Sequence, residues 1–353
     1  MSSFDIEDIK KEFKKMFGDN IAVDASTIVD RKRQIIPVSP VLDIALSGGI
    51  PEGCLVTCSG KPKSGKTVTS LCFAANCQKP EYGGRHVFFL NVEGRLKAMN
   101  LNGTKGLDLS KFTVIQSTAD KLMSAQDYLK VALHIIKTYP KCLVIIDSES
   151  ALCDEKELDT GIEYQNRGGV NKVFASFIRQ IANIVGTQDS IVWCIRHLAQ
   201  SQSQFGTTWN EKGAMGTQYQ ADVQMRIKFD KAWNVGSGEK QKQVGQEVHW
   251  LIESSALGRP HLEATSFLRY GSGIDCAYEM VNLGMDFGLI SKSGAWLTAD
   301  YMKRHLDLLG VKEWNDDLSK MLKTQGIDKM LTLLNENPKW LDALAEEIKG
   351  IVG

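Results

Sequence analysis

The chain has 353 residues, of which 43% are hydrophobic and 24% charged, and its formal net charge is zero. This composition is ordinary for a globular protein and excludes a largely disordered one. The neutral balance argues against nucleic-acid binding through one large basic face, but is compatible with a narrow internal binding channel. The length predicts one large domain with one or two small appendages.

The composition and the N-terminus also indicate where in the cell the protein acts. No run of about eighteen apolar residues occurs, so no membrane-spanning helix is expected. The N-terminus is charged and lacks the apolar core of a signal sequence. The eight cysteines form no CxxC pair and most lie in apolar runs, which favours reduced core thiols over a disulfide or zinc framework. We therefore expect a protein of the cytoplasm.

The first 34 residues are predicted to form a small charged unit. Ile6, Ile9, Phe13 and Met16 recur at helical spacing and predict a helix. A short stretch at residues 20–25 follows, and then a basic run that we interpret as a solvated linker.

From residue 35 the pattern is that of a mostly parallel twisted sheet with helices on both faces, an α/β fold. Two helices are predicted at residues 66–78 and 170–185, and the residues at 223–229 and 248–252 are interpreted as an antiparallel extension of the sheet. Short continuous apolar runs predict buried strands at residues 55–58, 87–92, 142–146 and 191–195.

After about residue 275 the chain becomes mainly helical, and Pro338 marks a helix boundary. The predicted organisation is an N-terminal element at residues 1–34, a core at 35–275 and a helical C-terminal domain at 276–353.

The strongest motif is a glycine-rich loop that follows a strand and opens a helix. It matches GxxxxGK[ST] in full, and such a loop wraps a phosphate with backbone amides. Lys66 can reach the β- and γ-phosphates, and the Thr67 hydroxyl can hold magnesium. The motif therefore predicts binding of a nucleoside triphosphate, with Mg²⁺. Its residues are Gly60, Lys61, Pro62, Lys63, Ser64, Gly65, Lys66 and Thr67.

Three polar residues stand at the ends of predicted strands, where ligands bind in doubly wound sheets. Asp147 follows a buried strand and is the acid that P-loop proteins use for magnesium. Glu93 can polarise the water that attacks the γ-phosphate, although spacing alone does not separate it from a surface acid. His197 can hydrogen-bond the γ-phosphate, against the alternative of a structural histidine.

Two long polar segments, at residues 157–169 and 199–216, follow these strand ends. Segments of this length are either functional or disordered. The aromatic rings of Phe205 and Trp209 are suited to stacking on bases, and the amides and hydroxyls around them to contacting a phosphate backbone. A simple mobile loop is the alternative. The candidate DNA-binding residues are Tyr164, Asn166, Arg167, Gln202, Gln204, Phe205, Gly206, Trp209 and Lys212.

Taken together, the motifs resemble the RecA/UvsX recombinases, most closely the RecA-like recombinases of T-even-type bacteriophages. The resemblance covers about residues 36–298. It rests on the lead-in at 41–53, the P-loop, the segments at 91–94 and 145–148, the strand ending at His197, the YGSGI segment at 270–274 and the stretch at 284–296.

The resemblance implies a RecA-type P-loop ATPase core and a role for each matched residue. Glu93 corresponds to the catalytic glutamate, His197 to the γ-phosphate sensor, and the two polar segments to the DNA-binding loops. Phe205 and Gly206 correspond to an aromatic-glycine step in the second loop. The resemblance also implies that Tyr270 and Gly271 lie near the nucleotide base of a neighbouring subunit. It further implies that the N-terminal helix, with Ile21, Ala22 and Ala25, docks on the next protomer.

The chain departs from the family pattern in two places. Family members carry two basic residues that reach the phosphates across the subunit interface, but Ser254 and Ala256 stand there and Arg259 is the nearby cation. The aromatic residue that stacks on adenine is replaced by Met99 and Asn100. The first departure puts activation of hydrolysis by the neighbouring subunit in doubt.

The resemblance implies an ATP-dependent DNA strand-exchange protein that forms helical filaments on single-stranded DNA, hydrolyses ATP at protomer interfaces and pairs with homologous duplex DNA. Loader, mediator and single-strand-binding proteins are implied partners, and a phage-encoded protein would act in the host cytoplasm. A hexameric helicase of the same fold is one alternative, but the N-terminal unit is short for its partner-binding domain. A non-hydrolysing filament or mediator subunit is the other, favoured by Ser254 and Ala256.

Overall fold

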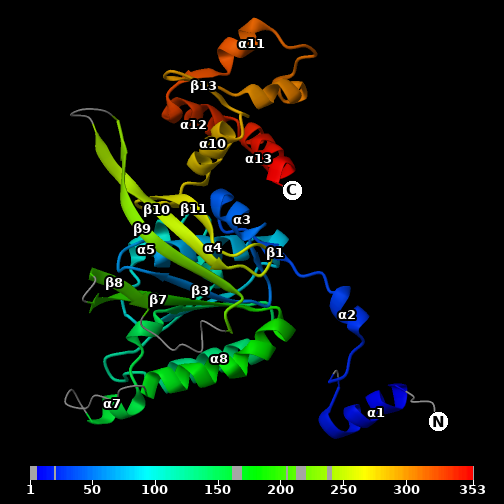
Figure 1. Ribbon diagram of the computed structural model, residues 1–353, viewed down its shortest axis with the longest axis vertical. Helices are drawn as coiled ribbons and strands as arrows, with labels where there is room; N and C mark the ends of the chain where they lie inside the picture. Colours follow the sequence, from blue (N-terminus) through cyan, green and yellow to red (C-terminus); the bar gives the residue numbers. More distant parts are fainter. Residues whose placement is uncertain are drawn as a thin grey trace. The chain divides into compact units, whose positions relative to one another are not determined.

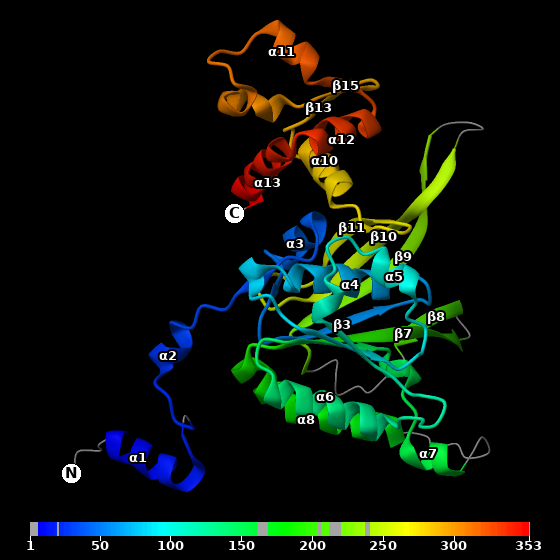
Figure 2. The ribbon, with the colours of Figure 1, turned by 180° about the vertical axis from the view of Figure 1, so that it is seen from behind.

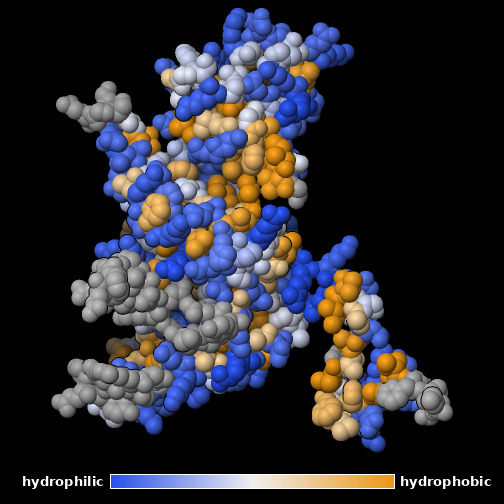
Figure 3. Space-filling model, in the orientation of Figure 1, coloured by the Kyte–Doolittle hydropathy of each residue, from blue (hydrophilic) through white to orange (hydrophobic). Residues whose placement is uncertain are grey.

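The computed structural model describes residues 6–19, 21–160, 169–203, 206–211, 220–236 and 241–352. The chain divides into two compact units, Met1–Gln34 and Ile35–Gly353 (Figure 1). The first contains the predicted helix, α1 (Ile6–Phe17), and a short helix α2 (Ala25–Val29), and neither buries a residue. Apolar side chains such as Phe13 and Val29 are exposed on this unit (Figure 3).

The second unit is built on a sheet that joins ten of the described strands, most of them where the apolar runs predict them. Its central strands are parallel. In spatial order these are β9 (Val223–Val235), β3 (Leu55–Gly60), β7 (Ile191–Ser203), β6 (Leu143–Asp147), β4 (Val87–Asn91) and β5 (Phe112–Ile115).

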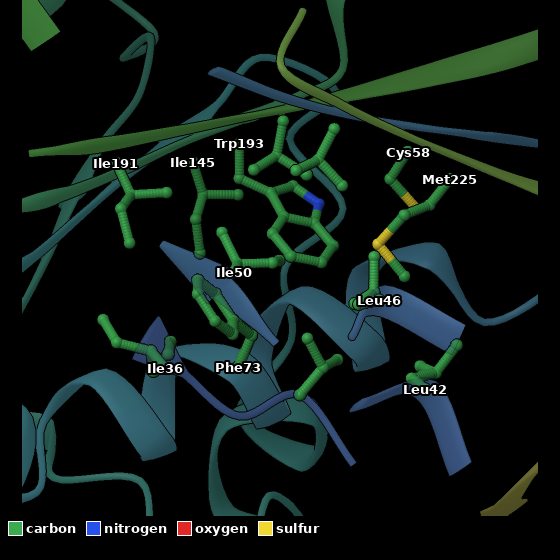
Figure 4. Close-up of a cluster of buried hydrophobic side chains, with 14 of the residues drawn as sticks. Ile36, Leu42, Leu46, Ile50, Cys58, Phe73, Ile145, Ile191, Trp193 and Met225 are labelled. Atoms are coloured by element: carbon green, nitrogen blue, oxygen red, sulfur yellow. The ribbon is translucent and has the colours of Figure 1, made fainter. Parts of the chain in front are cut away.

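Helices cover both faces of this sheet (Figures 1 and 2). On one face α3 (Pro40–Leu46) and α4 (Lys66–Cys77) pack on a buried cluster in which Phe73 lies against Trp193 (Figure 4). On the other face α6 (Ala125–Thr138) and α8 (Gly169–Gln188) cover a second cluster. Side chains of a strand point alternately to the two faces, so strands buried on both sides are continuously apolar.

The antiparallel part of the sheet begins one strand later than the sequence predicts. β9 is parallel to β3, because the chain returns to the same end of the sheet before entering β9. β10 (Lys242–Ser254), β11 (Leu262–Arg269) and β12 (Gly273–Ile274) then continue the sheet in antiparallel pairs. β8 (Gly206–Glu211) pairs antiparallel with the end of β7. β1 (Ile35–Ile36) and β2 (Ile50–Pro51) form a separate pair.

The residues after 275 pack around their own buried cluster, which includes Tyr301 and Met302. Their α-helices are α10 (Cys276–Asp286), α11 (Asp316–Met321), α12 (Ile327–Glu336) and α13 (Pro338–Val352), the last beginning at the predicted proline. A small sheet of β13 (Ser291–Ser293), β14 (Trp296–Thr298) and β15 (Lys323–Gln325) was not predicted, because three-residue strands carry no readable alternation. A domain limit at residue 275 stays a prediction.

The remaining helices are short. They are α5 (Ala98–Asn102), α7 (Glu155–Thr160) and the 3-10 turns η1 (Pro80–Tyr82), η2 (Leu109–Lys111), η3 (Glu149–Ala151), η5 (Asp300–Arg304) and η6 (Leu306–Leu309). All eight cysteines are free thiols, as the sequence predicts, and five of them are buried. Within the described part of the chain, no helix is both long and apolar enough to cross a membrane.

Candidate functional site

The glycine-rich loop lies between β3 and α4, as the motif requires. Two of its residues have left-handed backbone conformations, Lys63 with φ 63° and Gly65 with φ 101°. A side chain at Gly65 would also come within 2.1 Å of Leu268 on β11. The loop can therefore turn tightly and approach the sheet only with glycine at this position, and the turn directs the first amides of α4 toward the space above the strands.

Lys66 is buried and spans the loop from its first helical position. Its Nζ donates to the carbonyl oxygens of Gly60, at 2.9 Å, and Lys61, at 2.6 Å. Burial lowers the pKa of its ammonium group. A buried cation held only by carbonyl oxygens is well placed to contact a triphosphate, which supplies full negative charges.

The two predicted magnesium-binding residues meet, although they are 80 positions apart in the chain. The Thr67 hydroxyl donates to Asp147 Oδ2 at 2.7 Å. Burial raises the pKa of Asp147, and this hydrogen bond acts against the increase. A hydroxyl and a carboxylate are the hard oxygen ligands that Mg²⁺ takes alongside substrate phosphates and water. The described residues contain no cluster of three or more His, Cys, Asp or Glu side chains that could hold a metal by itself.

Glu93 and His197 lie on the same side of the P-loop and contact each other. His197 Nε2 is hydrogen-bonded to Glu93 Oε1, and the Ser148 hydroxyl donates to the same oxygen at 2.6 Å. Arg95 stands 3.6 Å from the other carboxylate oxygen. The hydrogen bond from His197 is the main reason that the pKa of Glu93 falls to about 2. Glu93 is thus an ionised carboxylate, able to orient water.

Sheet register explains why these distant residues converge. Gly60 on β3 is paired with His197 on β7, and Asn91 on β4 with Asp147 on β6. The strands are parallel, so their carboxyl ends meet at one edge of the sheet. The amide of Glu93 also donates to the carbonyl of Asp147, at 3.2 Å, which ties the two strand ends together.

Lys66, Thr67, Glu93, Asp147 and His197 line one cavity of about 420 Å³. Another wall of this cavity comes from the end of β11 and the segment that follows it. Tyr270 and Gly271 belong to that wall of the cavity in their own chain, and their place beside the nucleotide of a neighbouring subunit stays a prediction. Met99 also lines the cavity and is 69% exposed. Gly103 follows α5, and a side chain there would press on the Gly271 backbone at 3.1 Å.

Of the proposed DNA-binding residues, Tyr164, Asn166, Arg167, Gln204, Phe205 and Lys212 lie outside the described residues. Gln202, Gly206 and Trp209 lie in β7 and β8, for which the backbone pairing is described: Gln202 is opposite Thr207, and Trp209 is opposite Gln200. The second segment therefore begins as a direct continuation of the strand that carries His197.

The remaining predicted positions lie away from this pocket or in the N-terminal unit. Ile21 is 60% exposed and Ala25 begins α2. Ala22 lies between them. Arg259 follows β10, and the Ser254 hydroxyl at the end of that strand donates to the carbonyl of Asp222 at 3.3 Å. The sequence analysis missed Ser148 and Arg95 as partners of Glu93. Ser148 is adjacent to Asp147, but only the fold shows which carboxylate its hydroxyl reaches.

A protein-family model described as the RecA N-terminal domain matches residues 5–275. The chain belongs to the RecA family. Among its relatives, Protein RecA of Acholeplasma laidlawii is 24% identical over 315 residues, which cover 88% of this chain and 91% of the relative. Protein RecA of Sulfurimonas denitrificans is 28% identical over 280 residues, 75% of this chain and 76% of the relative. Protein RecA of Wolinella succinogenes is 25% identical over 350 residues, which cover 97% of this chain and 90% of the relative.

Membership in the RecA family supports a function in DNA recombination and repair, with ATP and magnesium at the P-loop. The matched region includes every residue around the cavity described above.

Proposed function

We propose that this RecA-family protein is an ATP-dependent DNA strand-exchange protein that forms helical filaments on single-stranded DNA and hydrolyses ATP between protomers. The observation that carries the proposal is the arrangement at one sheet edge. Lys66, Thr67 and Asp147 form a site for a magnesium triphosphate, and Glu93 and His197 stand beside it. β7, the strand that carries His197, continues to Ser203 and so enters the second polar segment.

In this mechanism each residue of the site has one role. Lys66 and the amides at the start of α4 hold the β- and γ-phosphates, and Thr67 with Asp147 holds magnesium. Bound ATP supplies the γ-phosphoryl group that is transferred to water. Glu93 orients that water, and His197 exchanges its contact with Glu93 for one with the γ-phosphate. Such a contact can order the segment that follows, the usual logic of a γ-phosphate switch.

Negative-stain electron microscopy with single-stranded DNA and a slowly hydrolysed ATP analogue tests the proposal. Extended helical filaments that need both ligands are expected. Closed rings would instead support the hexameric helicase. Steady-state ATP turnover, measured with and without single-stranded DNA, should rise when DNA is present.

A non-hydrolysing filament or mediator subunit is the second candidate, because Ser254 and Ala256 replace the cations that relatives place across the interface. Filaments without ATP turnover would favour it.

We further propose that the protein is of the subtype that resembles the recombinases of T-even-type phages. It would act in the cytoplasm of the cell or of the phage host, with homologous duplex DNA as its second substrate. Its proposed partners are loader, mediator and single-strand-binding proteins. We also propose that the domains end at residues 34 and 275.

A further inference from the structure

A buried ion pair lies directly beneath the nucleotide site, on the other face of the sheet. Arg196 Nε donates to Glu149 Oε2 at 2.6 Å, and the other arm of the guanidinium reaches Oε1 at 3.4 Å. The two side chains are 1% and 2% exposed. Removing two charges from water is costly, and apolar residues of similar volume often serve stability equally well. Stability alone is therefore a weak reason for this pair.

The two residues are adjacent in the chain to the groups that contact nucleotide. Arg196 precedes His197 on β7, and alternation along the strand directs them to opposite faces: Arg196 joins the side of Cys194, and His197 the side of Trp193 and α4. Glu149 begins η3, two residues after Asp147. The ion pair thus joins the strand that carries the γ-phosphate sensor to the turn that follows the magnesium ligand.

A second contact joins the same two elements. The amide of His197 donates to the Ser150 hydroxyl at 3.0 Å. With the ion pair, this connects η3 to β7 at two adjacent residues, through the side chain of Arg196 and the backbone of His197.

Both proposed DNA-binding segments follow these contacts along the chain, the first a few residues after η3 and the second directly after Leu198. η3 leads through α7 into residues 161–168, and β7 continues past Leu198 into its pairing with β8. We propose that Arg196 and Glu149 are positioning residues that make the two segments respond together when His197 contacts the γ-phosphate. This inference rests on the proposed function and adds to it the element that transmits nucleotide state to DNA.

The chain supplies a matched control at the opposite end of the sheet. Arg85 and Glu52 also form a buried ion pair, with side chains 0% and 5% exposed. Arg85 precedes β4 and donates to the carbonyl of Asp189, which precedes β7. This pair has the same chemistry and depth, but it lies at the amino ends of the strands, away from the phosphate site.

The test compares two double variants, R196M/E149L and R85M/E52L, which replace each pair by apolar side chains. Affinity for a fluorescent single-stranded oligonucleotide is measured with a slowly hydrolysed ATP analogue and with ADP. Coupling between two sites typically changes affinity by about 5- to 150-fold. We expect R196M/E149L to reduce the ratio of the two affinities by roughly tenfold, with ATP binding retained. R85M/E52L should keep the parental ratio.

Each outcome separates the inference from the function on which it rests. A parental ratio in R196M/E149L overturns the inference alone, as does an equal loss in both double variants. If the parental protein binds DNA equally well with the ATP analogue and with ADP, both the inference and the proposed function are overturned. Should R196M/E149L not fold, hydrogen exchange on the parental protein decides. The ATP analogue must slow exchange in residues 157–169 and 199–216 together, and protection of only one segment overturns the inference.

Discussion

Replacement of Glu93 by glutamine isolates the charge of this carboxylate from its packing. The amide oxygen of glutamine can still accept from Ser148 and His197, but hydrogen bonds to a charged group contribute about 1.5–3 kcal/mol, so folding should lose up to about that amount. A positioned base contributes about 10²- to 10⁴-fold to a rate, so turnover should fall by that factor. This corresponds to about 3–5 kcal/mol of transition-state stabilisation.

The assay is steady-state ATP turnover with saturating single-stranded DNA, together with equilibrium binding of a fluorescent ATP analogue. Glu347 provides the control, because it too lies beside a histidine and an arginine, His305 at 3.0 Å and Arg304 at 2.7 Å, but it is in α13 away from the cavity. Glu347→Gln should leave turnover unchanged. If Glu93→Gln weakens nucleotide binding as much as it slows turnover, Glu93 is a structural residue and the reasoning fails.

Three further results are expected. Lys66→Ala should abolish ATP-dependent filaments in the electron microscope because the cation facing the phosphates is lost, and normal filaments would contradict the site. His197→Ala should raise the pKa of Glu93 in the nucleotide-free protein from about 2 toward 4.5, so the acidic limb of the pH profile of kcat/KM for ATP should move to higher pH; an unmoved limb would assign the low pKa to another group. Phe205→Ala should weaken binding to several homopolymers by about 1–3 kcal/mol and spare ATP binding, whereas parental affinity would exclude stacking by this ring.

The sequence by itself predicted the features that depend on short stretches of chain. The P-loop is read from eight consecutive residues, because phosphate binding needs a particular local backbone and a lysine beside it. The buried strands were predictable because a sheet covered on both faces demands continuous apolar runs. The acids at 93 and 147 were identifiable because ligand sites in such sheets lie at the carboxyl ends of strands.

Only the tertiary structure decided which of these residues touch. His197 and Glu93 are 104 positions apart, and their contact depends on the register of three parallel strands, β4, β6 and β7, which no local pattern encodes. The sequence likewise did not predict the parallel pairing of β9 with β3 or the three-residue strands of the C-terminal region. The Arg196–Glu149 ion pair is the sharpest case, because charged residues in a sequence are expected at the surface. Their burial depends on the pairing of β6 with β7, which brings together two residues that are 47 positions apart in the chain.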